Sequence, residues 1–100
     1  MSNVLANIDY VVESKFPTAD DPTWYRVYKS GWLEQGGRFT GTSITFLLPF
    51  ADTNYSFHGT SINTNAGGAA NTVTDITTNS ITYYTMGNAG GIWYACGQGA

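Results

Sequence analysis

A stretch dense in aromatic side chains most constrains what this chain can fold into. It runs from Trp24 to Gly37 and reads W-Y-R-V-Y-K-S-G-W-L-E-Q-G-G. The pattern predicts two strands joined by a tight turn at residues 30–31, because glycine readily takes the positive φ that such a reversal needs. Alternation along the first strand would place Trp24, Arg26 and Tyr28 on one face.

The rest of the chain contains short stretches in which apolar and polar residues alternate. We expect strands at residues 8–13, 32–35, 43–48, 55–59, 72–76, 80–85 and 92–96. Gly36-Gly37 would end the second strand of the aromatic hairpin, and residues 38–42 would be a connection. No stretch of ten or more residues has helical periodicity. The sequence therefore predicts an all-β domain, an antiparallel β-sandwich of about seven or eight short strands.

The chain is poor in charge, and this limits its possible partners. Only 11% of its 100 residues are charged, against about 25% in an ordinary soluble domain. From Asp52 onward the formal charges are Asp52 and Asp75 alone, which favours a surface of Thr, Asn, Ser and Gly or one partly covered by another subunit. A net charge of −3 with four scattered cations argues against nucleic-acid binding. The longest apolar run, residues 46–51, is too short for membrane insertion.

The residues that could carry chemistry favour binding over catalysis. The single histidine, His58, and the single cysteine, Cys96, have no partners at metal-ligand spacing, so we expect no metal or cofactor. His58 would point to solvent, and Cys96 would be buried. A glycosidase would need two carboxylates facing each other across a cleft. The candidates are Glu13, Glu34, Asp52 and Asp75. No serine or threonine has a histidine placed to activate it.

Polar loops offer groups suited to sugar binding. They are residues 60–71, 77–79 and 86–91. Asparagine supplies both donors and acceptors for hydroxyl groups, and an exposed aromatic ring can stack on a sugar. At residues 83–84 and again at 93–94, alternation places one aromatic side chain inward and one outward. The candidate binding residues are Asn63, Asn65, Asn71, Asn79, Tyr84 and Asn88.

Five segments together resemble one known family. They are Y-V-V-E-S at 10–14, the aromatic stretch at 24–37, I-T-F-L-L-P-F at 44–50, D-T-N-Y-S at 52–56 and W-Y-A-C-G at 93–97. In this order they resemble the C-terminal domain at the distal tip of tailed-bacteriophage tail fibres. The resemblance extends from Ile8 to Gly97, and the S-G-W-x-E-Q-G-G element with the terminal W-x-A-C-G is its most specific part.

The resemblance implies a homotrimeric tip at the distal end of a virion's tail fibre, where it would meet a glycan or protein of the bacterial surface. The virion would be assembled in the host cytoplasm. Residues 1–7 would be a lead-in from an upstream fibre shaft, and residues 8–100 a single tip domain. Scaffold roles would fall on Trp24, Trp32, Gln35, Gly36 and Trp93, and receptor contacts on the loops. Two alternatives stay open: a cap that only holds the trimer together, and, less favoured, a tip that trims polysaccharide.

Overall fold

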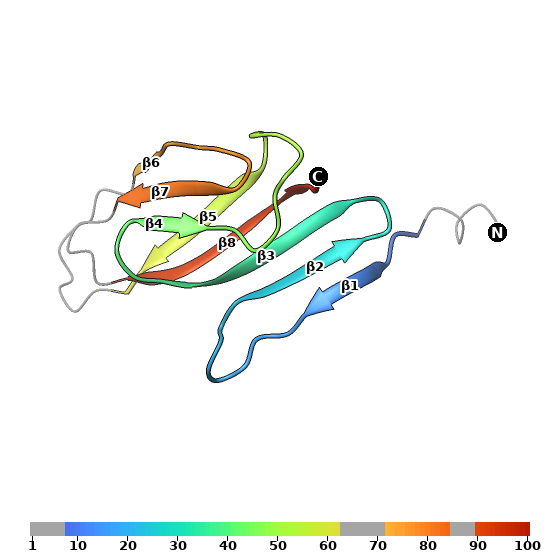
Figure 1. Ribbon diagram of the computed structural model, residues 1–100, viewed down its shortest axis with the longest axis horizontal. Helices are drawn as coiled ribbons and strands as arrows, with labels where there is room; N and C mark the ends of the chain where they lie inside the picture. Colours follow the sequence, from blue (N-terminus) through green and yellow to red (C-terminus); the bar gives the residue numbers. More distant parts are fainter. Residues whose placement is uncertain (1–7, 63–71, 85–89) are drawn as a thin grey trace.

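The computed structural model describes residues 8–62, 72–84 and 90–100, and within these ranges the chain forms eight antiparallel strands in two sheets and no helix (Figure 1). The strands are β1 (Val11–Lys15), β2 (Trp24–Tyr28), β3 (Trp32–Phe39), β4 (Ser43–Thr45), β5 (Ser56–Ser61), β6 (Thr72–Thr74), β7 (Ser80–Tyr84) and β8 (Gly91–Gln98). The predicted all-β fold and strand number are therefore confirmed. The described part contains no helix that could span a membrane.

A five-stranded sheet with the order β1-β2-β3-β8-β5 carries the architecture, and a three-stranded sheet with the order β4-β7-β6 packs against it. The two longest strands, β3 and β8, pair along their whole length, from Trp32 opposite Gln98 to Phe39 opposite Gly91. This pairing joins the aromatic hairpin to the last strand of the chain. The centre of this open sheet is therefore formed by strands far apart in sequence.

The core lies between the two sheets and is largely aromatic. Its buried apolar members are Leu33, Phe39, Ile44, Phe46, Phe50, Ile81, Tyr83, Trp93 and Ala95. Phe46 meets the rings of Phe50 and Tyr55 edge-on, with centroid distances of 5.2 and 5.1 Å. Edge-to-face pairs of this kind stabilise a core beyond the area they bury. Tyr55 and Phe57 pack against this core and His58 is exposed, as the alternation predicted.

Among the described residues, Gln35 is the one buried polar side chain. Its Oε1 accepts hydrogen bonds from the backbone N–H groups of Leu47 (2.9 Å) and Leu48 (3.1 Å), and its Nε2 donates to the Leu48 carbonyl at 2.9 Å. The segment after β4 has left its sheet at this point. The Gln35 side chain therefore makes the hydrogen bonds to the backbone of Leu47 and Leu48 that a neighbouring strand would otherwise make.

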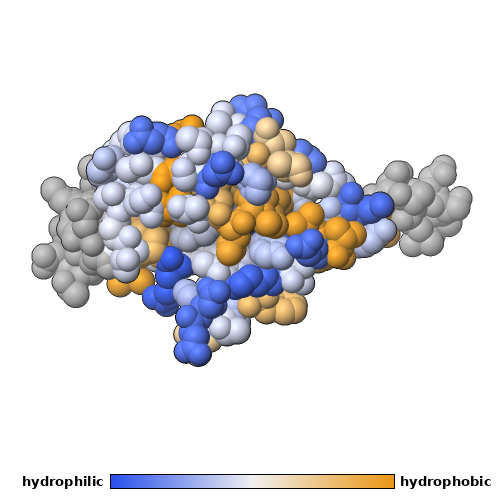
Figure 2. All heavy atoms as spheres, in the orientation of Figure 1, coloured by the Kyte–Doolittle hydropathy of each residue, from blue (hydrophilic) through white to orange (hydrophobic). Residues whose placement is uncertain are grey.

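Strands β1 and β2 extend beyond the three-stranded sheet (Figure 1). The large apolar side chains near β1 are consequently exposed: Ile8 55%, Tyr10 55%, Val11 41%, Val12 54% and Phe16 79%. Figure 2 shows apolar atoms at the surface where β1 begins. Exposed apolar residues gathered on one edge are typical of a protein–protein contact.

Several predicted strand limits were wrong. β1 runs over Val11–Lys15 instead of starting at residue 8, and β4 ends at Thr45 because Gln35 binds the backbone beyond it. β3 continues through Gly36-Gly37 to residue 39, so residues 38 and 39 belong to a strand and not to a connection. β5 includes residues 60–61, and β8 extends to residue 98.

Candidate functional site

Two of the three loops that carry candidate binding residues, 60–71 and 86–91, depart from the same end of the sandwich, whereas residues 77–79 lie at the other end of β7. The chain passes out of the described ranges, and back into them, next to two strand pairs: Ser61 opposite Gly91, and Thr72 opposite Tyr84. The two pairs belong to different sheets, but Phe39, which is paired with Gly91, packs its ring against Tyr83 at 5.5 Å. We call this end of the sandwich the loop end.

The described chain enters at the opposite end. Ile8 leads into β1, whose Val11 lies opposite Tyr28, next to the turn that brings Trp32 opposite Gln98. That turn contains Gly31 at φ 90°, as predicted for the hairpin. β3 spans the distance between the two ends, which is about 23 Å at roughly 3.3 Å per residue. Figure 1 shows the start of β1 and the loop end at opposite extremes of the long axis.

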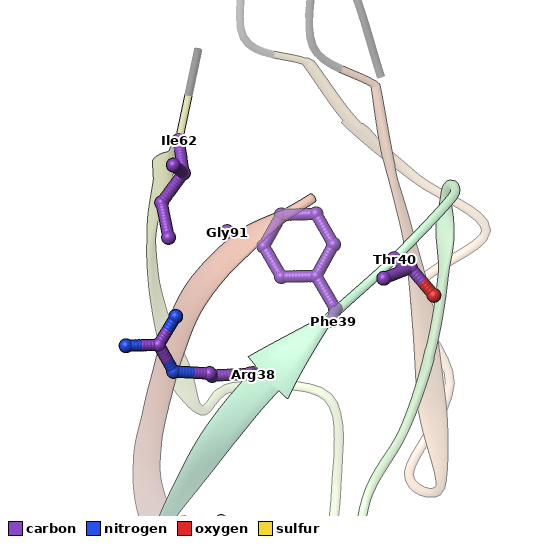
Figure 3. A pocket seen from close by; sticks show the side chains of 5 residues that line it. All are labelled: Arg38, Phe39, Thr40, Ile62 and Gly91. Atoms are coloured by element: carbon purple, nitrogen blue, oxygen red, sulfur yellow. The ribbon is translucent and has the colours of Figure 1, made fainter. Parts of the chain in front are cut away.

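A hollow of about 370 Å³ opens at the loop end, lined by Arg38, Phe39, Thr40, Ile62 and Gly91. Figure 3 shows the Arg38 and Ile62 side chains on one side of Gly91, the Phe39 ring beside Gly91, and the Thr40 hydroxyl directed away. Phe39 is buried and belongs to the core, whereas Ile62 is 46% exposed. The hollow therefore combines a rigid aromatic base with an accessible apolar wall and a guanidinium.

The outer surface of the five-stranded sheet, which the three-stranded sheet does not cover, is a second candidate region; we call it the open face. Trp24, Gly36, Tyr94 and His58 lie opposite one another across four neighbouring strands. The Tyr94 ring lies 5.8 Å from the ring of Trp24 and 5.8 Å from that of His58. The Trp24 indole crosses over Gly36, where a Cβ would come within 2.8 Å of its Nε1. The open face thus carries a continuous aromatic row.

Glu34 lies at the centre of the open face and is held by three donors. Its Oε1 accepts from Arg26 Nε at 3.1 Å and from the Tyr28 hydroxyl at 3.0 Å, and its Oε2 accepts from the Tyr94 hydroxyl at 3.2 Å. The hydrogen bond to this carboxylate raises the pKa of Tyr28, and burial raises the pKa of Tyr94. Both oxygens of Glu34 are therefore committed to neighbouring strands.

The other carboxylates weighed for catalysis lie elsewhere. Glu13 accepts from the Tyr25 hydroxyl at 2.7 Å, and Asp52 accepts from the backbone N–H of Asn54 at 2.8 Å. Asp75 follows β6 in the three-stranded sheet, with φ at 50°, while Glu34 belongs to the other sheet. Within the described ranges, no group of three or more His, Cys, Asp or Glu side chains could hold a metal ion.

The structure separates the predicted binding residues that it describes. Asn63, Asn65, Asn71 and Asn88 lie outside the described residues. Tyr84 is 49% exposed at the loop end and Tyr83 is buried, so one ring of this pair points inward and one outward, as predicted. Asn79 precedes β7, at the other end of that strand, where its carbonyl accepts from Phe46 N at 2.8 Å. Tyr84 and Asn79 therefore cannot share one small site.

The predicted scaffold residues divide between the core and the open face. Gln35 and Trp93 are buried in the core, and Gly36 lies beneath Trp24. Trp32, at 41% exposure, lies on the open face with Trp24. Cys96, expected to be buried, is only half-buried, because its strand position also places it on the open face.

Sequence reasoning missed Arg38. The sequence pattern predicts a connection at residues 38–42, because two successive glycines usually end a strand, whereas β3 continues to Phe39. The available signal was the alternation of Glu34, Gly36 and Arg38, which continues through the glycines.

Comparison with known proteins adds no relative: no family model, no curated protein and no solved structure matches this chain.

Proposed function

We propose that this chain is a non-enzymatic receptor-binding tip of a phage tail fibre, which attaches the virion to a glycan or protein of the bacterial surface. The observation that carries this proposal is the placement of the loops. Two of the three polar loops, 60–71 and 86–91, leave the sandwich at the end opposite the point where the described chain enters. A domain attached to a shaft at one end and carrying polar loops at the other has the geometry of a tip.

The sequence motifs support the same proposal. Four of the five segments that resemble tail-fibre tips lie on β1, β2, β3, β8 and on β4 with the residues that follow it, and the fifth, at 52–56, leads into β5. These elements form the large sheet and the core beneath it. The resemblance thus concerns the framework of the domain, and the loops between these elements are free to differ in sequence. Residues 1–7 would lead in from the shaft, and residues 8–100 would be the tip.

A homotrimer is the second part of the proposal. The exposed apolar side chains from Ile8 to Phe16 lie along one edge of the sheet, and a neighbouring copy would cover them. Three copies would also give three receptor sites. Linking weak sites raises the overall affinity by roughly 10²–10⁴ when all of them can engage together. The trimer would form in the host cytoplasm and end as the distal part of a virion fibre, with no nucleic acid or cofactor as partner.

The alternative of a purely structural cap also rests on a specific observation. The open face combines Trp24, Arg26 and Tyr94 around the carboxylate of Glu34. Trp, Tyr and Arg are the residue types that dominate the energetics of protein–protein contacts. A domain that used this face only to hold subunits in register would need no receptor site at all.

Binding to host cells distinguishes the two functions. The labelled tip is incubated with bacteria adsorbed by the full fibre, beside a variant in which residues 63–71 are replaced by a Gly/Ser linker of equal length. A control variant carries the same exchange at residues 17–20, in the β1–β2 connection. We expect the tip and the control to bind, and the 63–71 variant to bind at least tenfold less. A folded trimer that binds no cells, while the full fibre does, would leave only the cap function.

A further inference from the structure

We infer that the hollow at the loop end binds the carboxylate of an acidic surface sugar through Arg38. This inference rests on the proposed function and narrows the receptor to an anionic glycan. The residues that carry it are Arg38, Ile62 and Gly91, which line the hollow, and Ile92 and Thr60, which border it.

The first argument concerns which basic side chains form ion pairs. The chain has four of them. Lys15 pairs with Asp21 at 3.1 Å and Arg26 with Glu34 at 3.1 Å. All seven acidic side chains lie in the ranges that the structure describes, and none of them forms an ion pair with Arg38 or Lys29. Arg38 thus carries a positive charge that no carboxylate of this chain neutralises.

The second argument is position. Arg38 lies opposite Ile92, which in turn lies opposite Thr60, so three neighbouring strands present these side chains in one row. This row is one residue before the last paired row of the sheet at the loop end, which contains Gly91. Arg38, Ile92 and Thr60 are all exposed. Lys29, by contrast, lies in the turn at the other end of the sandwich. Among the described residues, Arg38 is therefore the cation that a ligand approaching the loop end would meet.

The third argument is the chemistry of the hollow. A guanidinium is a planar fork that matches a carboxylate with two parallel hydrogen bonds. Ile62 and Ile92, at 46% and 47% exposure, supply an apolar surface beside it, and the Thr60 hydroxyl can donate or accept. A pyranose ring with an apolar face, hydroxyls at its rim and one carboxylate fits this set. A phosphate dianion would leave charge unbalanced against a single cation.

The test uses the intact chain and three small probes: methyl glucuronide, methyl glucoside and glucose 6-phosphate. Binding is followed by NMR chemical-shift changes of the backbone amides at millimolar probe concentrations. We expect methyl glucuronide to bind with shifts centred on Arg38, Ile62 and Gly91, and the neutral glycoside to bind at least tenfold more weakly, which corresponds to about 1.4 kcal/mol. Equal binding of the two glycosides, tighter binding of the phosphate, or no binding of the glucuronide would overturn the inference.

Two substitutions locate the effect. Arg38→Gln removes the charge from an exposed side chain without an ion pair, so the fold should persist, and affinity for methyl glucuronide should fall at least tenfold. Arg38→Lys should retain part of the affinity for methyl glucuronide, because the positive charge remains but the planar guanidinium is lost. Lys29→Gln is the matched control and should change nothing. An equal loss in Lys29→Gln would show a general charge effect and contradict the site.

Cell binding separates this inference from the proposed function. If the wild-type tip binds host cells and Arg38→Gln binds them equally well, the acidic-sugar inference is wrong and the tip function stands. If the wild-type tip binds no cells but binds methyl glucuronide through Arg38, the carboxylate site stands and the tip function is wrong.

Discussion

At the scale of single residues, Gln35 illustrates how one amide organises a β-sandwich. Its side chain is completely buried and satisfies three backbone groups of Leu47 and Leu48. A buried polar group without a partner costs about 1–3 kcal/mol. Gln35 therefore allows the chain to leave β4 early and still pack Phe46 and Phe50 into the core.

Replacing Gln35 tests this role. Gln35→Leu fills similar space but leaves two N–H groups and one carbonyl unpaired, and we expect the free energy of unfolding to fall by about 2–5 kcal/mol. Gln98→Leu is the matched control, because Gln98 is exposed and its amide makes one hydrogen bond, to the Ser30 carbonyl. Its cost should stay within about 1 kcal/mol. Denaturant unfolding of both variants measures the difference, and similar losses would contradict the argument.

The tyrosines of the open face predict a titration that depends on Glu34. The hydrogen bond to the Glu34 carboxylate raises the pKa of Tyr28, because a phenolate beside that carboxylate is disfavoured. This stabilisation is fully present below about pH 10, the ordinary tyrosine pKa, and is lost as the pH rises through the raised value. Glu34→Gln removes the negative charge, so the pKa of Tyr28 should fall towards 10.

Tyr25 provides an internal control for this titration, because its pKa is raised by a hydrogen bond to a different carboxylate, that of Glu13. NMR titration of the tyrosine rings should show Tyr28 shifting in Glu34→Gln and Tyr25 staying constant. Glu13→Gln should give the reverse pattern. A common shift of both tyrosines in either variant would indicate a change of the whole sheet instead of a local contact.

At the scale of elements, β3 depends on a glycine in its middle. A Cβ on Gly36 would lie 2.6 Å from the Trp93 carbonyl oxygen and 2.8 Å from Trp24 Nε1, both closer than van der Waals contact allows. Gly36→Ala should therefore cost about 1–3 kcal/mol of unfolding free energy, as overpacking typically does. The rings of Trp24 and Tyr94 would also separate.

A double-mutant cycle assigns the cause of that cost. In a Trp24→Leu background the indole is gone, so Gly36→Ala should cost less than in the wild type, and the difference measures the Trp24 contact. Denaturant unfolding of the four proteins gives the cycle. Equal costs in both backgrounds would assign the strain entirely to the Trp93 carbonyl.

The same glycine explains what could and could not be read from the sequence. Period-two alternation located all eight strands to within a few residues, and it correctly predicted that one of Tyr83 and Tyr84 points inward and the other outward. Glycine usually weakens a strand, so Gly36 predicts a strand end, but the Trp24 indole that requires glycine here comes from the neighbouring strand. A strand end at Gly36 would also leave Arg38 outside the strand, so the sequence did not indicate its place beside the loop end. The pairing of β8 with β3 and β5, which brings Phe39, Gly91 and Ser61 together at the loop end, joins residues far apart in sequence, so no local pattern predicts it.

At the scale of the whole molecule, the uncovered edge at β1 predicts association. Val12 is 54% exposed and lies among other exposed apolar side chains. We expect the wild type to sediment as a trimer at micromolar concentration, and Val12→Asp to sediment as a folded monomer, because a buried unpaired carboxylate is costly. Thr45→Asp, an exposed change in the three-stranded sheet, is the control. A wild-type monomer at this concentration would contradict the trimer.

The paired strand ends at the loop end also indicate that the segment between them could be replaced by foreign sequence. Ser61 with Gly91 and Thr72 with Tyr84 hold each point of departure beside another strand, so the frame does not rely on what is inserted between them. Doubling the length of a flexible insert costs only about 0.6 kcal/mol in closure entropy. Foreign peptides could thus be grafted between residues 62 and 72 and displayed on a folded domain, which makes this end a practical acceptor for engineered specificity.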